Sequence, residues 1–185
     1  MKKIFILLTA AVMLTACGNS SQISPSATPQ PPQTTQTPEP EAIVKTEVPP
    51  VAAASTEGLT SVSSVDCSLI SDDTFETVTL YTSAEKENGR FVWDDHARWV
   101  LEITSDTGSA FTLYDTEVSN GSIYFDIVEV SNKTFVLLRN ISTAANYTKA
   151  FTFEDSKLYE TNELDLNEMK NIPINLIFTS TPNYR

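Results

Sequence analysis

The distribution of aromatic residues limits where this chain can build a folded core. Sixteen of the seventeen aromatic residues lie at or beyond Phe75, and the remaining one is Phe5. Residues 18–64 hold eight of the ten prolines, together with many Ser, Thr, Gln and Ala residues. A segment without large apolar side chains cannot offset the conformational entropy that ordering costs. We therefore predict a disordered linker that ends at residue 64 and one folded domain over residues 65–185.

Apolar and polar residues alternate through much of the predicted domain. Trp99, Leu101 and Ile103 share one face of a run, while Glu102 lies on the other face. A period of two residues is typical of half-buried strands in an antiparallel sheet. We predict strands near residues 76–83, 90–93, 97–104, 110–117, 122–130, 134–139, 147–154, 157–161 and 174–179. The predicted fold class is all-β: a small antiparallel β-meander that forms either a barrel or a sandwich.

Turn residues separate several of these runs. Asn88-Gly89 and Asn120-Gly121 each supply the two positive φ angles of a type I′ hairpin. Further connections are expected over residues 105–108, 131–133 and 154–156. A short helical turn is expected over residues 165–171, because an aspartate at its start can cap it and Pro173 ends it.

The first residues have the organisation of an export signal. Lys2 and Lys3 precede an apolar run from Ile4 to Leu14, which is too short to span a bilayer as a helix. The sequence Leu-Thr-Ala-Cys follows directly and ends at Cys17. This tetrapeptide resembles the lipobox of bacterial lipoprotein precursors, which the type II signal peptidase cleaves.

The resemblance implies a lipid anchor and a location. Residues 1–16 would be the signal peptide, and cleavage would leave Cys17 as an N-terminus carrying a diacylglycerol on its sulfur. Residues 17–64 would then be the lipidated N-terminus and the linker. Two acyl chains hold a protein stably at a bilayer, so the implied location is the extracytoplasmic side of the cell membrane. The alternative is an ordinary signal peptide that happens to be followed by a cysteine.

The charge of the chain excludes one class of partner. It carries 24 acidic and 12 basic residues, a formal net charge of −12. Nucleic-acid backbones are held by clustered Lys and Arg, so we expect no nucleic-acid partner. An envelope protein or a glycan is the expected partner of the domain, beside the membrane itself.

The densest polar cluster runs from residue 93 to residue 99. In one interpretation, His96 is the general base of a small surface hydrolase and is oriented by Asp94 or Asp95. In another, Trp93 and Trp99 line a carbohydrate-binding surface. The simpler interpretation is an aspartate-rich turn between strands, flanked by tryptophans that pack in the core.

No motif in the sequence assigns a catalytic residue. There is one histidine, and the chain contains no Gly-x-Ser-x-Gly or His-Glu-x-x-His motif. We therefore predict no cofactor and no metal site. Cys67 would be the lone free thiol after acylation of Cys17, and we expect it to be buried as a small apolar residue. These observations favour a non-enzymatic binding or envelope-associated module.

Overall fold

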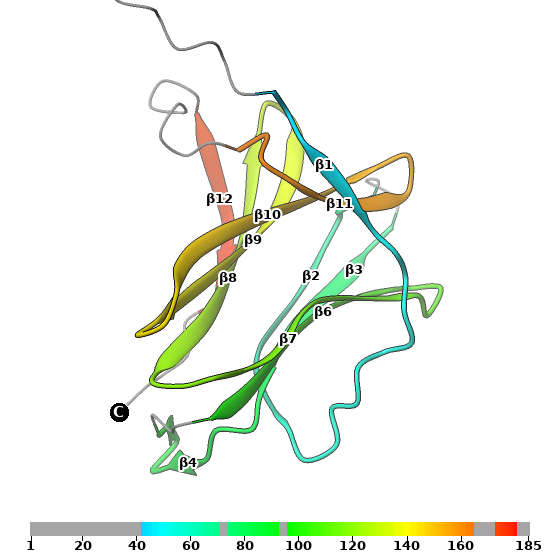
Figure 1. Ribbon diagram of the computed structural model, residues 1–185. Coiled ribbons are helices and arrows are strands. Elements are labelled where there is room, and N and C mark those ends of the chain that lie inside the picture. The colour runs from blue at the N-terminus through cyan, green and yellow to red at the C-terminus, as the bar shows by residue number, and fades with distance from the viewer. Residues whose placement is uncertain (1–41, 71–73, 93–95, 165–172, 181–185) are drawn as a thin grey trace, which may run out of the picture. The chain divides into compact units, whose positions relative to one another are not determined.

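The computed structural model describes residues 42–70, 74–92, 96–164 and 173–180, and this part of the chain consists of antiparallel strands and their connections (Figure 1). The chain divides into two units, Met1–Pro40 and Glu41–Arg185. The whole first unit lies outside the described residues. The helical turn expected over residues 165–171 also lies outside them, so that prediction stays open.

The strands form two main sheets and one short hairpin. The six-stranded sheet, called sheet A, contains in spatial order β1 (Lys45–Val48), β11 (Lys157–Thr161), β10 (Asn146–Glu154), β9 (Lys133–Ser142), β8 (Gly121–Val130) and β12 (Ile174–Thr179). The four-stranded sheet, called sheet B, contains β2 (Thr60–Cys67), β3 (Glu76–Thr82), β6 (Ala97–Ser105) and β7 (Ala110–Val118). The hairpin pairs β4 (Lys86–Glu87) with β5 (Arg90–Phe91).

The two sheets pack face to face, which confirms the all-β class and selects the sandwich over the barrel. No strand ladder joins sheet A to sheet B in the described part of the chain. Side chains make the connection instead: the rings of Phe111 on β7 and Phe153 on β10 meet edge to face, with centroids 5.4 Å apart. Consecutive strands are neighbours over most of both sheets, as expected for a meander.

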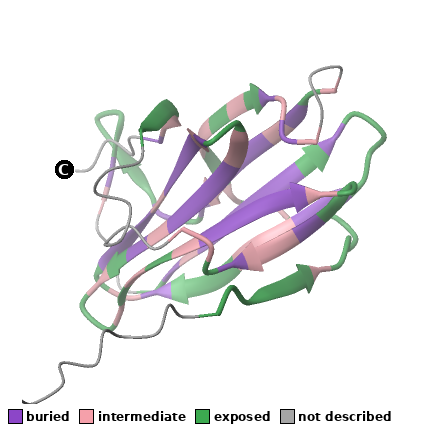
Figure 2. Ribbon diagram, turned by 90° about the horizontal axis from the view of Figure 1, so that it is seen from above, coloured by how far each residue is buried: buried purple, intermediate pink, exposed green. Residues whose placement is uncertain are grey.

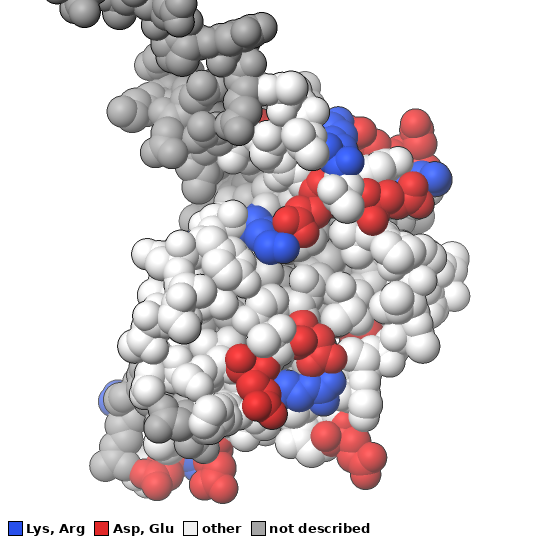
Figure 3. Space-filling view, viewed as in Figure 1, with Lys and Arg blue, Asp and Glu red and all other residues white. Residues whose placement is uncertain are grey.

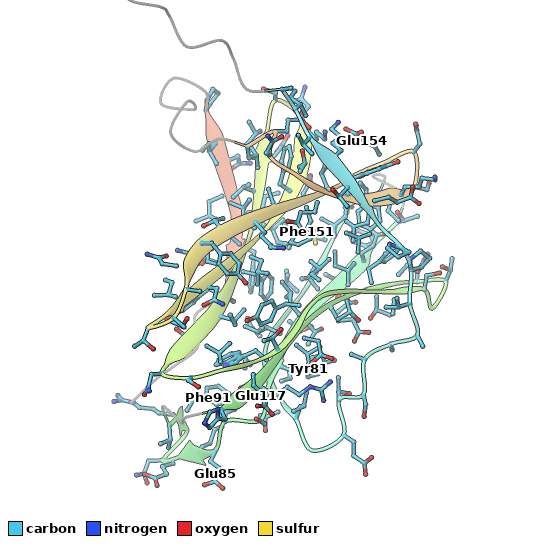
Figure 4. All side chains as sticks on the ribbon, viewed as in Figure 1. Tyr81, Glu85, Phe91, Glu117, Phe151 and Glu154 are labelled. Carbon is cyan, nitrogen blue, oxygen red and sulfur yellow. The ribbon has the colours of Figure 1, made fainter. Side chains whose placement is uncertain are left out.

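The main core lies between the sheets. Both sheets contribute large side chains with almost no exposed surface, among them Trp99, Leu101 and Ile103 from β6 and Phe125 and Phe151 from sheet A. Figure 4 shows Phe151 in the space between the two sheets. These residues occupy alternate strand positions, so the period of two residues correctly identified the inward face.

A second, smaller apolar cluster lies on the opposite face of sheet A. It contains Val128 and Val130 of β8, Phe135 and Leu137 of β9, and Ala150 of β10. Strands β8 and β9 therefore carry apolar residues on both faces, which explains why alternation is weak in their sequences. In Figure 2 the central strands are largely buried, whereas outer strands and several hairpin tips are exposed.

Most of the predicted strands and turns are confirmed. Each of the nine predicted strand regions overlaps one observed strand, and in the region 90–93 this is β5, a strand of two residues. Asn88 and Gly89 have φ angles of 53° and 78°, as a type I′ turn requires. The pairs at 131–132 and 155–156 also have positive φ angles, so these two-residue connections close the β8–β9 and β10–β11 hairpins.

The predicted end of the linker at residue 64 is wrong. Strand β1 pairs with β11 at the edge of sheet A, and β2 begins at Thr60. The chain between them runs along sheet B: the N–H of Val51 donates to the carbonyl of Ala110 at 3.0 Å, and the N–H of Ala54 donates to a carboxylate oxygen of Glu102 at 3.1 Å. The folded unit therefore starts about twenty residues earlier than composition indicated, at Glu41.

The hairpin predicted at Asn120-Gly121 is also wrong. Strands β7 and β8 belong to different sheets, so this connection carries the chain from one sheet to the other. Asn120 has a φ of 47°, but Gly121 is the first residue of β8. A Cβ atom on Gly121 would lie 2.3 Å from the Cβ of Ser142 on β9. Glycine is required here by the close approach of two strands and not by a positive φ.

Candidate functional site

The polar cluster that the sequence singled out is only partly described. Trp93, Asp94 and Asp95 lie outside the described residues. His96 is exposed, with a φ of 84°, and its Nδ1 lies 3.3 Å from the hydroxyl of Ser119. A histidine base acting on a serine needs a third group to orient the ring. No hydrogen bond from His96 to a carboxylate is found in the described part of the chain.

Trp99 does not lie at the surface. It is 1% exposed on β6, within the core between the sheets. Its ring faces are covered by protein and are not available to a sugar, so the position agrees with the packing interpretation. Trp99 is thereby removed from the candidate carbohydrate-binding residues.

A different polar cluster joins the two sheets. Asn140 lies on β9, and its Nδ2 group donates to the phenolic oxygens of Tyr114 on β7, at 3.2 Å, and Tyr147 on β10, at 3.5 Å. Asn140 is 5% exposed, whereas both tyrosines are half-buried. The cluster therefore has a buried amide at one end and two phenols that reach the surface at the other. We call these three residues the tyrosine–asparagine cluster.

The cluster is electrically neutral. Burial, and then the neighbouring phenol of Tyr147, raise the pKa of Tyr114 to about 12. Its hydroxyl consequently keeps its proton near neutral pH and can both donate and accept hydrogen bonds. The Oδ1 atom of Asn140 is buried and has no hydrogen-bond partner among the described residues. Two phenols thus meet the amide nitrogen of Asn140, while its amide oxygen has no partner within the described part of the chain.

Sequence reasoning missed this cluster, although a signal existed. Val136, Leu138 and Asn140 occupy successive inward positions of β9, and the first two are core residues. A polar residue at the end of an apolar face marks a position where packing alone does not determine the residue type. The partners come from two other strands, and the sequence gives no indication of which strands those are.

Glu76 forms a second buried polar group. It is fully buried at the start of β3, and one carboxylate oxygen accepts the N–H groups of Leu69, at 2.8 Å, and Ile70, at 3.2 Å. This arrangement holds the chain after β2 in place. Cys67 is nearby and buried, as predicted; burial and the charge of Glu76 raise its thiol pKa to about 11. A thiol that remains protonated is a poor nucleophile.

A hollow of about 210 Å³ lies between the chain after β2 and the β8–β9 turn. Its lining includes Ile70, Lys133 and Phe153. Small-molecule sites usually measure about 300–1,000 Å³. The Nζ of Lys133 is already 2.5 Å from Glu154 and 2.7 Å from Glu163. The hollow is therefore small and its cation is engaged, so it is a weaker candidate than the tyrosine–asparagine cluster.

Several of the surface cations pair with carboxylates. Arg98 binds Asp115 through two hydrogen bonds, at 2.7 and 2.8 Å, and Lys45 joins Lys133 in bridging the same two glutamates. On the face seen in Figure 3, basic side chains lie against acidic ones. Arg98 lowers the pKa of Asp115, and Lys133 together with Lys45 lowers the pKa of Glu154. The described residues therefore form no basic patch on that face.

The structure gives no support for a metal centre or a membrane-spanning helix within the residues it describes. No group of three or more His, Cys, Asp or Glu side chains in this part of the chain is placed to hold a metal ion. Among the same residues, no helix has the length and apolar character needed to cross a bilayer. No protein-family model matches the chain, and neither the curated proteins nor the solved structures include a significant match to it.

Proposed function

We propose that this protein is a bacterial lipoprotein that displays a β-sandwich binding module on the extracytoplasmic side of the cell membrane. The single observation that carries the anchoring is the order of signals at the start of the chain. A basic pair, an apolar run and the Leu-Thr-Ala-Cys sequence that ends at Cys17 follow one another at the spacing of a lipoprotein signal.

The proposed anchor is strong enough to act alone. Each buried methylene contributes about 0.8 kcal/mol, so one acyl chain binds marginally and a diacylglycerol binds stably. The revised domain boundary shortens the proposed tether to residues 18–40, and this segment retains six of the prolines. A coil of that length has a mean reach of roughly 25–30 Å, and a fully extended polyproline II chain would reach about 75 Å. The module would therefore work close to the membrane.

Binding, and not hydrolysis, is the activity that the arrangement of side chains favours. The tyrosine–asparagine cluster offers neutral hydrogen-bonding groups at a surface-accessible junction of the two sheets. The pair of His96 and Ser119 is exposed, and a 3.3 Å separation alone does not make a nucleophile. The proposed partner is a component of the envelope, either a glycan or a protein.

The anchoring proposal is tested by replacing each cysteine in turn. Cys17→Ser should leave the precursor uncut or release the protein from membranes, because the sulfur that carries the lipid is gone. Cys67→Ala is the matched control, since this thiol is buried within the domain, and it should remain in the membrane fraction. Fractionation and mass spectrometry of the N-terminal peptide give the readout. Normal processing and full membrane retention of Cys17→Ser would refute the proposal.

A further inference from the structure

The amide of Asn140 is the feature of this domain that packing explains least. Its side chain lies on the inward face of β9, directly across from the fully buried Ile123 on β8. One end of the amide reaches two tyrosines, while Oδ1 is buried and has no partner among the described residues. Unpaired buried polar atoms are uncommon in folded proteins, and each requires an explanation. A ligand that supplies the missing donor is such an explanation.

The two tyrosines lie next to the amide that carries this atom. Tyr114 and Tyr147 come from opposite sheets, and both are half-buried. The hydroxyl of Thr116 interacts with that of Tyr114 and belongs to an exposed residue on the same strand. The bond from Asn140 to Tyr147, at 3.5 Å, is at the limit of a useful hydrogen bond. Of the two phenols, that of Tyr147 is therefore held more weakly by the amide.

The chemistry of the cluster selects the kind of ligand. The unused atom is an acceptor, so the ligand must bring an N–H or O–H group, and an anion is unsuited. The phenols can donate to a carbonyl oxygen or accept from a hydroxyl, and their faces can pack on a sugar ring. Two charged groups on the inward face of sheet A, Lys149 and Glu160, are 3.0 Å apart and bind each other.

We propose that Tyr114, Asn140 and Tyr147 form a binding site for an acetamido-bearing glycan. The acetamido N–H donates to Asn140 Oδ1, a phenol donates to the acetamido carbonyl, and the sugar ring packs against one of the half-buried tyrosine rings. This assignment deepens the binding module proposed above and rests on that proposal. It does not depend on the lipid anchor, because the three residues all belong to the folded domain.

The test titrates the full-length protein, extracted from membranes in detergent, with three probes in a calorimeter. They are a tetrasaccharide of N-acetylglucosamine, a tetrasaccharide of glucose that lacks acetamido groups, and an uncharged N-acetylated alanine peptide. We expect heat of binding with the first probe only. Tyr114→Phe, Tyr147→Phe and Asn140→Leu should each weaken binding by roughly three- to tenfold, the effect of losing one hydrogen bond. Thermal unfolding monitored by circular dichroism confirms that each variant is folded.

Tyr81→Phe is the matched control, because Tyr81 is also half-buried but lies on β3, away from the cluster and on the outer face of sheet B (Figure 4). It should bind like the unmodified protein. The proposed site is wrong if the N-acetylglucosamine probe does not bind. It is also wrong if Tyr81→Phe weakens binding of that probe as much as the substitutions in the cluster do. If the glucose probe binds with equal affinity, the acetamido group has no role in binding. If instead the peptide binds, and the same three substitutions weaken its binding, the partner is a protein and not a glycan. None of these results affects the fractionation of Cys17→Ser, so the two proposals fail separately.

Discussion

Replacing Asn140 with leucine should leave the domain about as stable as it is now or more stable, which is an unusual expectation for a residue that is 5% exposed. The buried Oδ1 atom without a partner costs about 1–3 kcal/mol, which leucine would recover. The substitution removes one hydrogen bond of 3.2 Å and a weaker one of 3.5 Å, together worth about 1–1.5 kcal/mol net. Both phenols are half-exposed and can bond to water instead. The balance is a change of about −0.5 to +2 kcal/mol in the free energy of unfolding, so at most a marginal loss of stability is expected.

Urea denaturation followed by circular dichroism measures this change directly. Leucine has the same branching as asparagine, so its two methyl groups occupy the positions of the amide oxygen and nitrogen. Asn140→Asp is the informative companion, because it places a charge at the same buried position and should destabilise by several kcal/mol, as an uncompensated buried charge does. A loss of more than about 1.5 kcal/mol in Asn140→Leu, at an unchanged m-value, would show that the amide stabilises the fold and would refute the reasoning.

Four further results are expected. Glu76→Ala should lower the free energy of unfolding by about 3–5 kcal/mol, measured in urea, because two loop amides lose a buried acceptor; Glu76→Gln, which keeps that oxygen, should cost far less, and equal losses would contradict this role. Cys67, with a thiol pKa of about 11, should react with iodoacetamide at pH 8 much more slowly than in urea; equal rates would show that it is accessible. Gly121→Ala should cost at least about 1–3 kcal/mol in the same assay, because the new Cβ meets a facing strand at 2.3 Å; an unchanged midpoint would be inconsistent with that approach. Finally, Arg98 lowers the pKa of Asp115 below its ordinary 3.8, so their pairing stabilises the fold above that pH and is lost as pH falls through the lowered value; the urea midpoint should fall less on acidification in Arg98→Leu, and an identical fall would argue against the pair.

The strands beyond residue 75 were predictable because one inward-facing core organises them. Each half-buried strand must place apolar side chains on alternate positions, and this requirement is visible in a single sequence. Val78 and Leu80 on β3 and Leu101 and Ile103 on β6 are examples, all of them with no exposed surface. Where a strand is apolar on both faces, as over residues 135–138 of β9, length and turn residues identify it instead.

The two N-terminal strands escaped prediction for physical reasons. Strand β1 has only four residues, Lys-Thr-Glu-Val, and three of them are exposed. It is held by pairing with β11, at the far end of the domain sequence, and by the bonds of Lys45 to two glutamates. Strand β2 contains a bulge between Ser61 and Ser63, which interrupts the alternation of its side chains. Long-range pairing and a register shift leave no local pattern.

The same dipeptide adopts two different structures in this chain. Asn88-Gly89 closes a hairpin with both φ angles positive, while Asn120-Gly121 begins a strand after a crossing between sheets. A dipeptide reports that glycine is needed, but not whether the need is a positive φ or close packing. At Gly121 the need arises from Ser142, which lies on the neighbouring strand.

The candidate site shows the same limit of local patterns. The cluster of residues 93–99 attracted attention because its members are adjacent in sequence, yet Trp99 lies in the core and His96 meets only Ser119 among the hydrogen-bond partners described. The tyrosine–asparagine cluster takes one residue from each of β7, β9 and β10. Its formation requires two sheets to pack in one particular alignment, which no spacing along the chain encodes.

A comparison of Glu76 with Asn140 distinguishes a buried polar residue that serves the fold from one that is available for binding. Glu76 and Asn140 each carry one buried oxygen without a partner among the described residues. The other oxygen of Glu76 accepts two backbone N–H groups, and water cannot easily take its place, so the fold itself accounts for this residue. Among the described residues, the amide of Asn140 bonds only to phenols that reach solvent, so the fold gains little from it. Opposite effects of Glu76→Ala and Asn140→Leu on stability would therefore separate a structural carboxylate from an amide whose remaining role is to meet a ligand.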